Sequence, residues 1–304
     1  MERLLNLIEE RGWKGRIVPV TRLPYIREAI LSRYEQGLID KKLYREQLNF
    51  FSFDPPADLS GACSIFILAA PTPQMRIIFY WNGRPVPVIL PPTYVSYTPR
   101  TGMVQAALAD CLRSEGYQLA KARLPLKTLA VCSGLAKYGR NNICYVAGMG
   151  SFLQLIGAWS DMPCESSPWQ EPETLDRCKS CRACMQICPT KAITGDRFLL
   201  HAELCLTFHN ESADDFASWI NPLWHHCLFG CMRCQTICPE NRTVSDWFED
   251  RVTFTEQETA LLIHHVPFDK LPAETIAKMK SLEINENYQS LCRNLSMIIN
   301  RKTA

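Results

Sequence analysis

Cysteine is the residue type with an obvious chemical role here, because the 304 residues contain 15 cysteines and many of them are regularly spaced. The first motif, C-x2-C-x2-C-x3-C before a proline, consists of Cys178, Cys181, Cys184 and Cys188. The second, C-x2-C-x3-C before a proline, consists of Cys231, Cys234 and Cys238. In two-cluster ferredoxins the first three cysteines of such a motif bind one [4Fe–4S] cluster, and the cysteine before the proline binds the other. We therefore predict two [4Fe–4S] clusters.

Zinc is the main alternative, because it also binds cysteine pairs spaced C-x2-C. Zinc sites seldom combine three evenly spaced cysteines with a following Cys-Pro pair, and here that pair occurs twice, so the spacing favours iron and sulfur. The second motif lacks its first cysteine, since Leu228 stands at that position. Cys227 and Cys205 are both candidates for the missing ligand, and neither has the standard spacing. Because eight cysteines suffice, His225 and His226 are predicted to have packing or surface roles.

The overall composition is that of an ordinary globular protein, with 47% hydrophobic and 21% charged residues. The net charge of +2 indicates neither a nucleic-acid nor a membrane partner. The first residues resemble an amphipathic helix rather than a signal peptide, and no apolar run approaches the roughly 18 residues that span a bilayer. Many cysteines without a secretion signal indicate a reducing cytoplasm and metal binding. The six cysteines outside the cluster question are predicted to lie mostly in the core: Cys63, Cys111, Cys132, Cys144, Cys164 and Cys292.

The secondary-structure patterns predict an α+β fold. The apolar run over residues 64–70 is typical of a buried strand, and Asn82-Gly83 predicts a hairpin turn between strands 75–81 and 86–90. Further strands are expected at 16–20, 117–120, 142–146 and 152–159, and helices at 25–37, 103–114, 126–132, 254–265, 274–282 and 288–300. We predict three parts: an α/β domain with a mixed sheet (1–165), a ferredoxin-type domain (166–245) and a C-terminal helical extension (246–304).

A second feature is a long stretch without acidic residues, between Glu115 and Asp161. It contains five lysines and arginines and the glycine-rich string CSGLAKYGRNNICYVAGMGSF. Glycines allow close approach of a ligand to the backbone, and cationic side chains favour phosphate. A buried region whose few charges reach solvent explains the same pattern, and the string matches neither the Walker loop nor the dinucleotide fingerprint. The residues alone leave both interpretations open.

Taken together, the glycine-rich string and the cysteine motifs resemble epoxyqueuosine reductases, a family of cobalamin-dependent iron–sulfur enzymes. The family's GLGxxGKN string corresponds to Gly134–Asn141, and its GSxxxLGE-like segment begins at Gly150 and Ser151. Its isolated cysteine matches Cys205 in CLTF, and its GCxxCQxxCPxN segment matches Gly230–Asn241. The segment DLSGACSIFILAAPTP and the terminal LCRNLSMIIN are similar to family segments as well.

The resemblance implies a cluster ligand set and a corrinoid site. It favours Cys205 over Cys227, which gives one cluster on Cys178, Cys181, Cys184 and Cys238 and the other on Cys188, Cys205, Cys231 and Cys234. The corrinoid would bind the acid-free stretch, through Gly134, Tyr138, Gly139, Arg140, Asn141, Gly150 and Ser151. A low-potential electron donor would supply electrons, which pass through the clusters to the corrinoid and reduce a substrate; in the family that substrate is a modified tRNA.

This sequence departs from the family where the proton donor is expected. The family has an aspartate before the glycine-rich string, whereas residues 116–133 contain neither Asp nor Glu. No catalytic residue is therefore assigned, and Tyr94 and Tyr97, predicted to lie in a loop, are substitute candidates. The alternative function is a ferredoxin-type electron-transfer protein that donates electrons to a partner, for example a corrinoid protein, without reductase activity.

Overall fold

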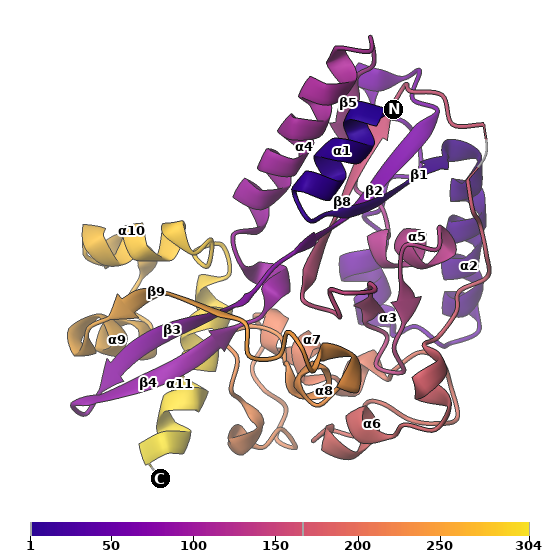
Figure 1. Cartoon of the computed structure of the whole chain (residues 1–304). Coiled ribbons are helices and arrows are strands. Elements are labelled where there is room, and N and C mark those ends of the chain that lie inside the picture. The colour runs from indigo at the N-terminus through magenta and orange to yellow at the C-terminus, as the bar shows by residue number, and fades with distance from the viewer. Residues whose placement is uncertain (1, 166, 304) are drawn as a thin grey trace. The chain divides into compact units, whose positions relative to one another are not determined.

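The chain forms two compact units whose segments interleave in sequence. The computed structural model describes residues 2–165 and 167–303 (Figure 1). Unit 1 consists of Met1–Pro71, Pro99–Arg182 and Ile193–Ala202, and unit 2 of Thr72–Thr98, Ala183–Ala192 and Glu203–Ala304. The predicted hairpin thus groups with the C-terminal half of the chain rather than with the segments that flank it. The division into three parts at residues 165 and 245 stays a prediction.

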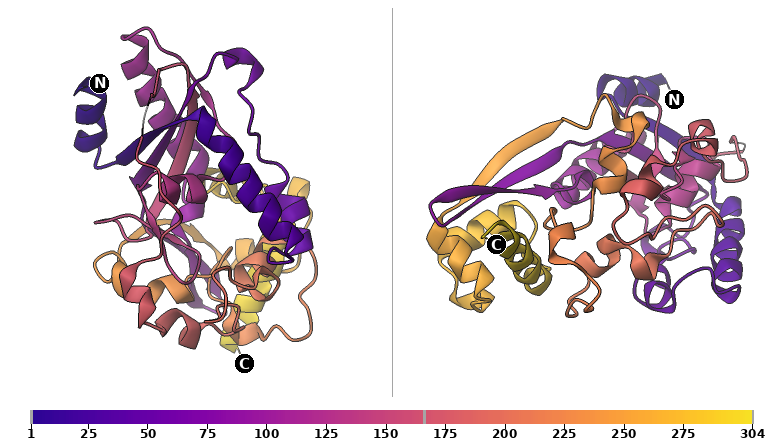
Figure 2. Two further views of the ribbon diagram at one scale, coloured as in Figure 1. Left: turned by 90° about the vertical axis from the view of Figure 1, so that its right-hand side faces the viewer. Right: turned by 90° about the horizontal axis from the view of Figure 1, so that it is seen from below.

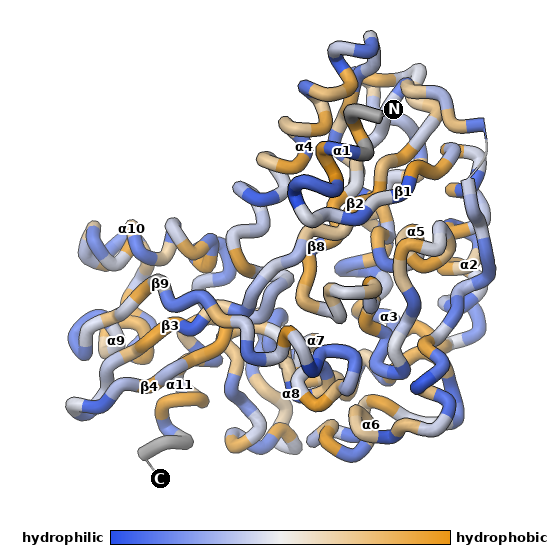
Figure 3. The backbone as a smooth tube through the Cα atoms, in the orientation of Figure 1, coloured by the Kyte–Doolittle hydropathy of each residue, from blue (hydrophilic) through white to orange (hydrophobic). Residues whose placement is uncertain are grey.

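Unit 1 is built around a four-stranded antiparallel sheet in the order β1-β2-β8-β5. Its strands are β1 (Lys14–Pro19), β2 (Ser64–Pro71), β5 (Leu119–Lys121) and β8 (Leu153–Ser160). The predicted buried strand is β2, which pairs with β1 on one side and β8 on the other and is coloured mainly as hydrophobic in Figure 3. Strand β1 lies at the sheet edge and ends at Pro19, as expected for a residue that cannot donate a backbone hydrogen bond.

Helices cover both faces of this sheet. Because side chains alternate along a strand, Phe66 and Leu68 of β2 face one side and Ile65 and Ile67 the other. The first face packs against α1 (Glu2–Glu10) and α4 (Tyr97–Arg113), and the second against α2 (Leu23–Glu35) and α5 (Leu126–Cys132). Unit 1 also contains α3 (Lys41–Leu43) and a two-stranded hairpin of β6 (Lys137–Tyr138) and β7 (Cys144–Tyr145).

Two predictions about α4 and β7 need correction. Helix α4 begins at Tyr97 rather than near residue 103, because Pro99 is tolerated in the first turn of a helix, where its missing N–H has no intrahelical partner. Tyr97 is therefore helical and not in a loop. The strand expected over 142–146 is reduced to the two residues of β7.

Unit 2 contains a second sheet, in the order β4-β3-β9. The predicted hairpin joins β3 (Gln74–Trp81) to β4 (Arg84–Leu90), and both turn residues have positive φ, 50° at Asn82 and 66° at Gly83. Strand β9 (Phe248–Phe254) pairs in parallel with β3 and was not predicted. The mixed sheet was expected within residues 1–165, whereas the sheet of unit 1 is antiparallel and the mixed sheet of the described residues includes β9, which lies beyond residue 165. With both units containing sheets and helices, the α+β fold class is confirmed.

The C-terminal helices pack against this second sheet. They are α9 (Glu256–Ile263), α10 (Ala273–Ser281) and α11 (Tyr288–Thr303), coloured orange to yellow in Figure 2. Their apolar side chains form one core with Ile77 and Phe79 of β3 and Val88 of β4. Three shorter helices belong to the same unit: α6 (Ala183–Ile187), α7 (Leu206–Glu211) and α8 (Arg233–Thr236). None of the helices in the described part of the chain has the length and hydrophobicity to cross a bilayer.

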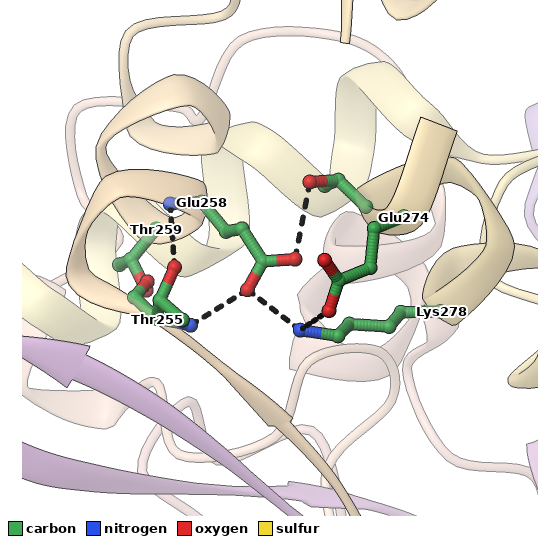
Figure 4. Close-up of polar contacts among 6 residues, drawn as sticks. Thr255, Glu258, Thr259, Glu274 and Lys278 are labelled. Atoms are coloured by element: carbon green, nitrogen blue, oxygen red, sulfur yellow. Dashed lines mark hydrogen bonds and ion pairs between the residues drawn. The ribbon is translucent and has the colours of Figure 1, made fainter. Parts of the chain in front are cut away.

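A largely buried ion pair joins α9 to α10 (Figure 4). Lys278 Nζ lies 2.8 Å from Glu258 Oε2, and Glu258 also accepts hydrogen bonds from the Thr255 N–H at 2.8 Å and the Thr275 hydroxyl at 3.1 Å. Thr255 and Glu258 form a reciprocal capping box at the start of α9. Each carboxylate oxygen therefore has a partner, as the burial of a charge requires.

Candidate iron–sulfur site

The two cysteine motifs end on two short helices that pack against each other in unit 2. Cys184 lies in α6 and Cys188 directly follows it, while Cys234 lies in α8 and Cys238 follows two residues after its end. Helices α6 and α8 are in contact. The two halves of the sequence pattern are thus also related in space. The unit boundary falls within the first motif, so Cys178 and Cys181 group with unit 1.

Three of the cysteines predicted for the second cluster lie close together in unit 2. Burial raises the pKa of the Cys205 thiol, and the nearby Cys188 adds to that rise. Burial also raises the pKa of Cys231 to about 12, with further contributions from Cys205 and Cys188. Cysteine binds metal as the thiolate. Without metal, burial and neighbouring thiols oppose ionisation of these cysteines, whereas a cationic cluster would stabilise their thiolates. This donor set fits an iron–sulfur cluster.

The structure also distinguishes the two candidates for the uncertain ligand. Cys227 is fully buried and forms a β-bridge with Ile89 of β4. Burial is the main cause of its raised pKa, and Cys231 is the one cysteine that contributes to that rise. Cys205 is only half-buried and lies near both Cys188 and Cys231. The ligands of one cube must surround it, so this position favours Cys205. The assignment stays a prediction.

In unit 1 the glycine-rich string contacts the segment that leads into the first motif. The N–H of Tyr138 donates to the Glu173 carbonyl at 2.8 Å, and the Tyr138 carbonyl accepts from the Leu175 N–H at 2.9 Å. The Arg140 guanidinium donates to the backbone carbonyl of Cys178. Two features that the sequence presented separately, the acid-free stretch and the cluster motif, are therefore joined by hydrogen bonds.

The predicted cofactor residues lie on a tight backbone path that follows α5. Gly134 takes φ +71° where α5 ends, and Gly150 takes φ +57° and accepts the Val146 N–H at 2.9 Å. Asn141 is buried, and its amide donates to the Tyr145 hydroxyl at 3.0 Å. Ser151 is also buried. Asn141 thus holds the β6–β7 loop in shape, a role that its position in the family string did not indicate.

Gly139 is required by this packing. A Cβ at residue 139 would clash with Asn141 Oδ1 and lie 2.5 Å from the Tyr145 ring. We expect Gly139→Ala to lower the free energy of unfolding by about 1–3 kcal/mol, the usual cost of overpacking a core. Urea unfolding measures the change. Gly61→Ala is the control, because nothing lies within 4 Å of a Cβ there. Equal stabilities of the two variants would contradict the expectation.

The two tyrosines considered as substitute proton donors, Tyr94 and Tyr97, belong to unit 2, whereas the acid-free stretch belongs to unit 1. Tyr94 belongs to unit 2, where its hydroxyl donates to Glu211 and its ring packs on Gly230. Burial and Glu211 raise the pKa of Tyr94, which makes it a weaker acid. Tyr97 is 43% exposed.

His225, which was predicted to have a packing or surface role, is fully buried, and its ring centre lies 4.5 Å from that of Phe216.

Unit 1 has a surface hollow of about 380 Å³, lined by Arg33, Leu38, Glu171, Pro172, Arg197, Phe198 and Leu199. It does not include the glycine-rich residues, although Phe198 contacts Tyr138 edge-on, with ring centroids 5.3 Å apart. In the part of the chain that the structure describes, no three His, Cys, Asp or Glu side chains are placed to hold a single metal ion.

The cysteine motifs and the packed helices α6 and α8 define the class of protein. Residues 177–241 match the model of the 4Fe-4S double cluster binding domain, so the chain is an iron–sulfur protein with two clusters. The prediction of [4Fe–4S] clusters over zinc is confirmed. The matched range includes all eight predicted ligands as well as Cys227.

Part of the chain is similar in sequence to epoxyqueuosine reductases, and nearly the whole chain is similar to them in fold, which confirms the resemblance. It is 33% identical to the enzyme of Pseudomonas aeruginosa over 117 residues, 38% of this chain and 31% of that relative. The chain therefore spans about a third of the length of the curated relative that it matches. The solved structure from Bacillus subtilis shares the fold, with a TM-score of 0.69 at 19% identity over 99% of this chain and 81% of that one. An epoxyqueuosine reductase solved with an epoxyqueuosine-modified tRNA-Tyr stem loop gives a TM-score of 0.68 at 17% identity, over 99% of this chain and 80% of that one.

Proposed function

We propose that this protein is an iron–sulfur oxidoreductase of the epoxyqueuosine reductase type, which passes electrons through two [4Fe–4S] clusters to a bound corrinoid. The observation that carries the proposal is the double-cluster domain within a chain that shares the reductase fold. One cluster is held by Cys178, Cys181, Cys184 and Cys238. The other is held by Cys188, Cys205, Cys231 and Cys234.

The glycine-rich string supports a corrinoid site. The Arg140 Nε is buried and has no hydrogen-bond partner in the described part of the chain, although the same guanidinium donates to the Cys178 carbonyl. An unpaired buried donor is costly, and an amide or phosphate oxygen of a corrinoid would satisfy it. Arg140 would therefore orient the cofactor while fixing the backbone of a cluster ligand. When bound, the corrinoid supplies low-potential cobalt for cleavage of a difficult bond.

The substrate that the relatives suggest is an epoxyqueuosine-modified tRNA. Electrons would come from an external low-potential donor. Arg123 and Lys127 are two of the exposed cations of the acid-free stretch that would contact tRNA phosphates. Because the acid before the glycine-rich string is missing, the proton for reduction would come from another group of the protein or from solvent water. If the protein does not turn over the modified stem loop, its substrate is a molecule other than epoxyqueuosine-modified tRNA.

The test is anaerobic reconstitution with iron, sulfide and hydroxocobalamin, followed by quantification of iron and corrinoid on the same sample. We expect both to co-elute with the protein, and Arg140→Met to weaken corrinoid retention about tenfold, the loss expected for one charge-assisted hydrogen bond. Lys127→Met, an exposed cation in the same unit, serves as the control and should retain the cofactor. Addition of the modified stem loop and a reductant then tests for turnover.

The outcomes separate the two functions. Two clusters with no corrinoid spectrum would favour an electron-transfer protein that serves a partner. Corrinoid binding and turnover of the stem loop without any partner would exclude that alternative. Retention of corrinoid by Arg140→Met at the wild-type level would remove Arg140 from the site.

A further inference from the structure

The backbone that leads into Cys231 is held by side-chain amides from two helices of unit 2. Asn210 of α7 donates from Nδ2 to the Gly230 carbonyl at 2.8 Å. Asn294 of α11 donates from Nδ2 to the Leu228 carbonyl and to the Asn210 carbonyl, both at 2.8 Å. Both asparagine side chains are fully buried. The Asn294 amide has partners at both its nitrogen and its oxygen, whereas Asn210 Oδ1 has none among the described residues, so Asn294 is the better satisfied of the two.

The neighbouring Arg293 fixes the orientation of the Asn294 amide. Its guanidinium donates to Asn294 Oδ1 at 3.0 Å and to the His209 carbonyl of α7 at 2.8 Å, and it lies 3.8 Å from the centre of the Phe216 ring. Because Oδ1 faces the guanidinium, Nδ2 must face the two carbonyls. The Arg293–Asn294 pair therefore joins α7 to the segment 228–230.

The other side of this segment is fixed as well. The Leu228 N–H donates to the Ile89 carbonyl of β4 at 2.8 Å. Gly230 takes φ +63°, and a Cβ there would lie 3.1 Å from the Tyr94 ring. The position of the next residue, Cys231, is thus determined by contacts with β4, α7 and α11.

Two predicted ligands of one cluster are next to segments that the Arg293–Asn294 pair holds by hydrogen bonds. Cys205 directly precedes α7, whose last turns carry His209 and Asn210, and Cys231 directly follows Gly230. Asn294 contacts both segments. From this geometry we infer that Arg293 and Asn294 are positioning residues for the second [4Fe–4S] cluster, which makes the C-terminal helix α11 part of the cluster site. These residues lie about 50 positions beyond the end of the matched cluster domain at residue 241.

The inference rests on the proposed assignment of Cys188, Cys205, Cys231 and Cys234 to one cluster, and not on reductase activity or on a corrinoid. It predicts a selective effect. Loss of the Asn294 donors frees the carbonyls of Leu228 and Asn210, so the second cluster is weakened while the ligands of the first keep their positions. A role limited to general packing would affect both clusters or neither.

The test compares Asn294→Ala and the isosteric Asn294→Asp, which keeps the shape but loses both donors, with Ser296→Ala on the same helix. Ser296 donates to the Ile263 and Cys292 carbonyls and does not contact segment 228–230 in the described structure. After anaerobic reconstitution, iron is counted on the folded monomer, and the dithionite-reduced protein is examined by electron paramagnetic resonance. We expect both Asn294 variants to fall from about eight irons per chain to about four. They should also lose the magnetic interaction between clusters, whereas Ser296→Ala keeps both.

Each other outcome counts against the inference. Asn294 variants that keep about eight irons and the wild-type spectrum would overturn it while leaving the proposed function intact. Wild-type protein that binds no iron would overturn the proposed function and the inference together. If both Asn294 variants lose their circular dichroism signal, Arg293→Lys, which keeps the charge but cannot reach Asn294 Oδ1 and the His209 carbonyl together, decides: full iron content and an unchanged spectrum would refute the positioning role.

Discussion

Replacing Cys205 with serine is expected to remove about half of the bound iron, from about eight to about four atoms per chain. Serine binds iron poorly because its hydroxyl ionises far less readily than a thiol. Cys205 lies near both Cys188 and Cys231, so its loss would open one corner of the second cluster as we propose it. Iron and sulfide analysis after anaerobic reconstitution, with electron paramagnetic resonance of the reduced protein, measures the effect.

Cys227→Ser is the matched control, since Cys227 also lies near Cys231 but is fully buried in a bridge with β4. It should retain both clusters. A buried hydroxyl costs about 1–3 kcal/mol of stability, so iron is counted on folded protein alone. The reverse result, with iron lost from Cys227→Ser and kept by Cys205→Ser, would transfer the ligand role to Cys227.

The second large effect is expected at the ion pair between α9 and α10. Replacing Lys278 with methionine leaves the Glu258 carboxylate, whose side chain is only 10% exposed, without its cation. Breaking a fully buried pair costs about 3–5 kcal/mol. Because Lys278 is 21% exposed, water compensates in part, and we expect a loss of about 2 kcal/mol. Lys280→Met, at an exposed position of the same helix, should change the free energy of unfolding by less than about 0.5 kcal/mol.

The same pair makes the stability depend on pH. Burial raises the pKa of Glu258, but Lys278 and Thr255 outweigh it, so the net pKa lies below its ordinary value. A lowered pKa in the folded state contributes stability above the unfolded-state pKa, and that contribution is lost as the pH falls through the folded-state value. The difference between wild type and Lys278→Met in urea unfolding should therefore be largest near neutral pH and shrink in acid. If the difference in unfolding free energy were the same near neutral pH and in acid, the Glu258–Lys278 pair would not be the cause of the pH dependence.

Local patterns predicted those elements whose cause is local. The apolar run of β2 and the Asn82-Gly83 hairpin turn depend on a few consecutive residues, and both were found as expected. Strand β9 was missed because its sequence, FEDRVTF, contains three charged residues and has no clear alternation. It is a strand because β3, about 170 positions earlier, offers it a hydrogen-bonding edge.

The sequence by itself determined that this protein binds two [4Fe–4S] clusters, since the ligand spacing lies within short segments and the thiolate chemistry resides in the residue type. Only the tertiary structure placed Cys205 near Cys188 and Cys231, joined Arg140 to the Cys178 carbonyl, and brought Asn294 to the segment before Cys231. These contacts connect residues that are 17 to 66 positions apart in the sequence. Such pairs leave no periodic trace in the sequence, because they are selected by the packing of helices and strands around a shared core.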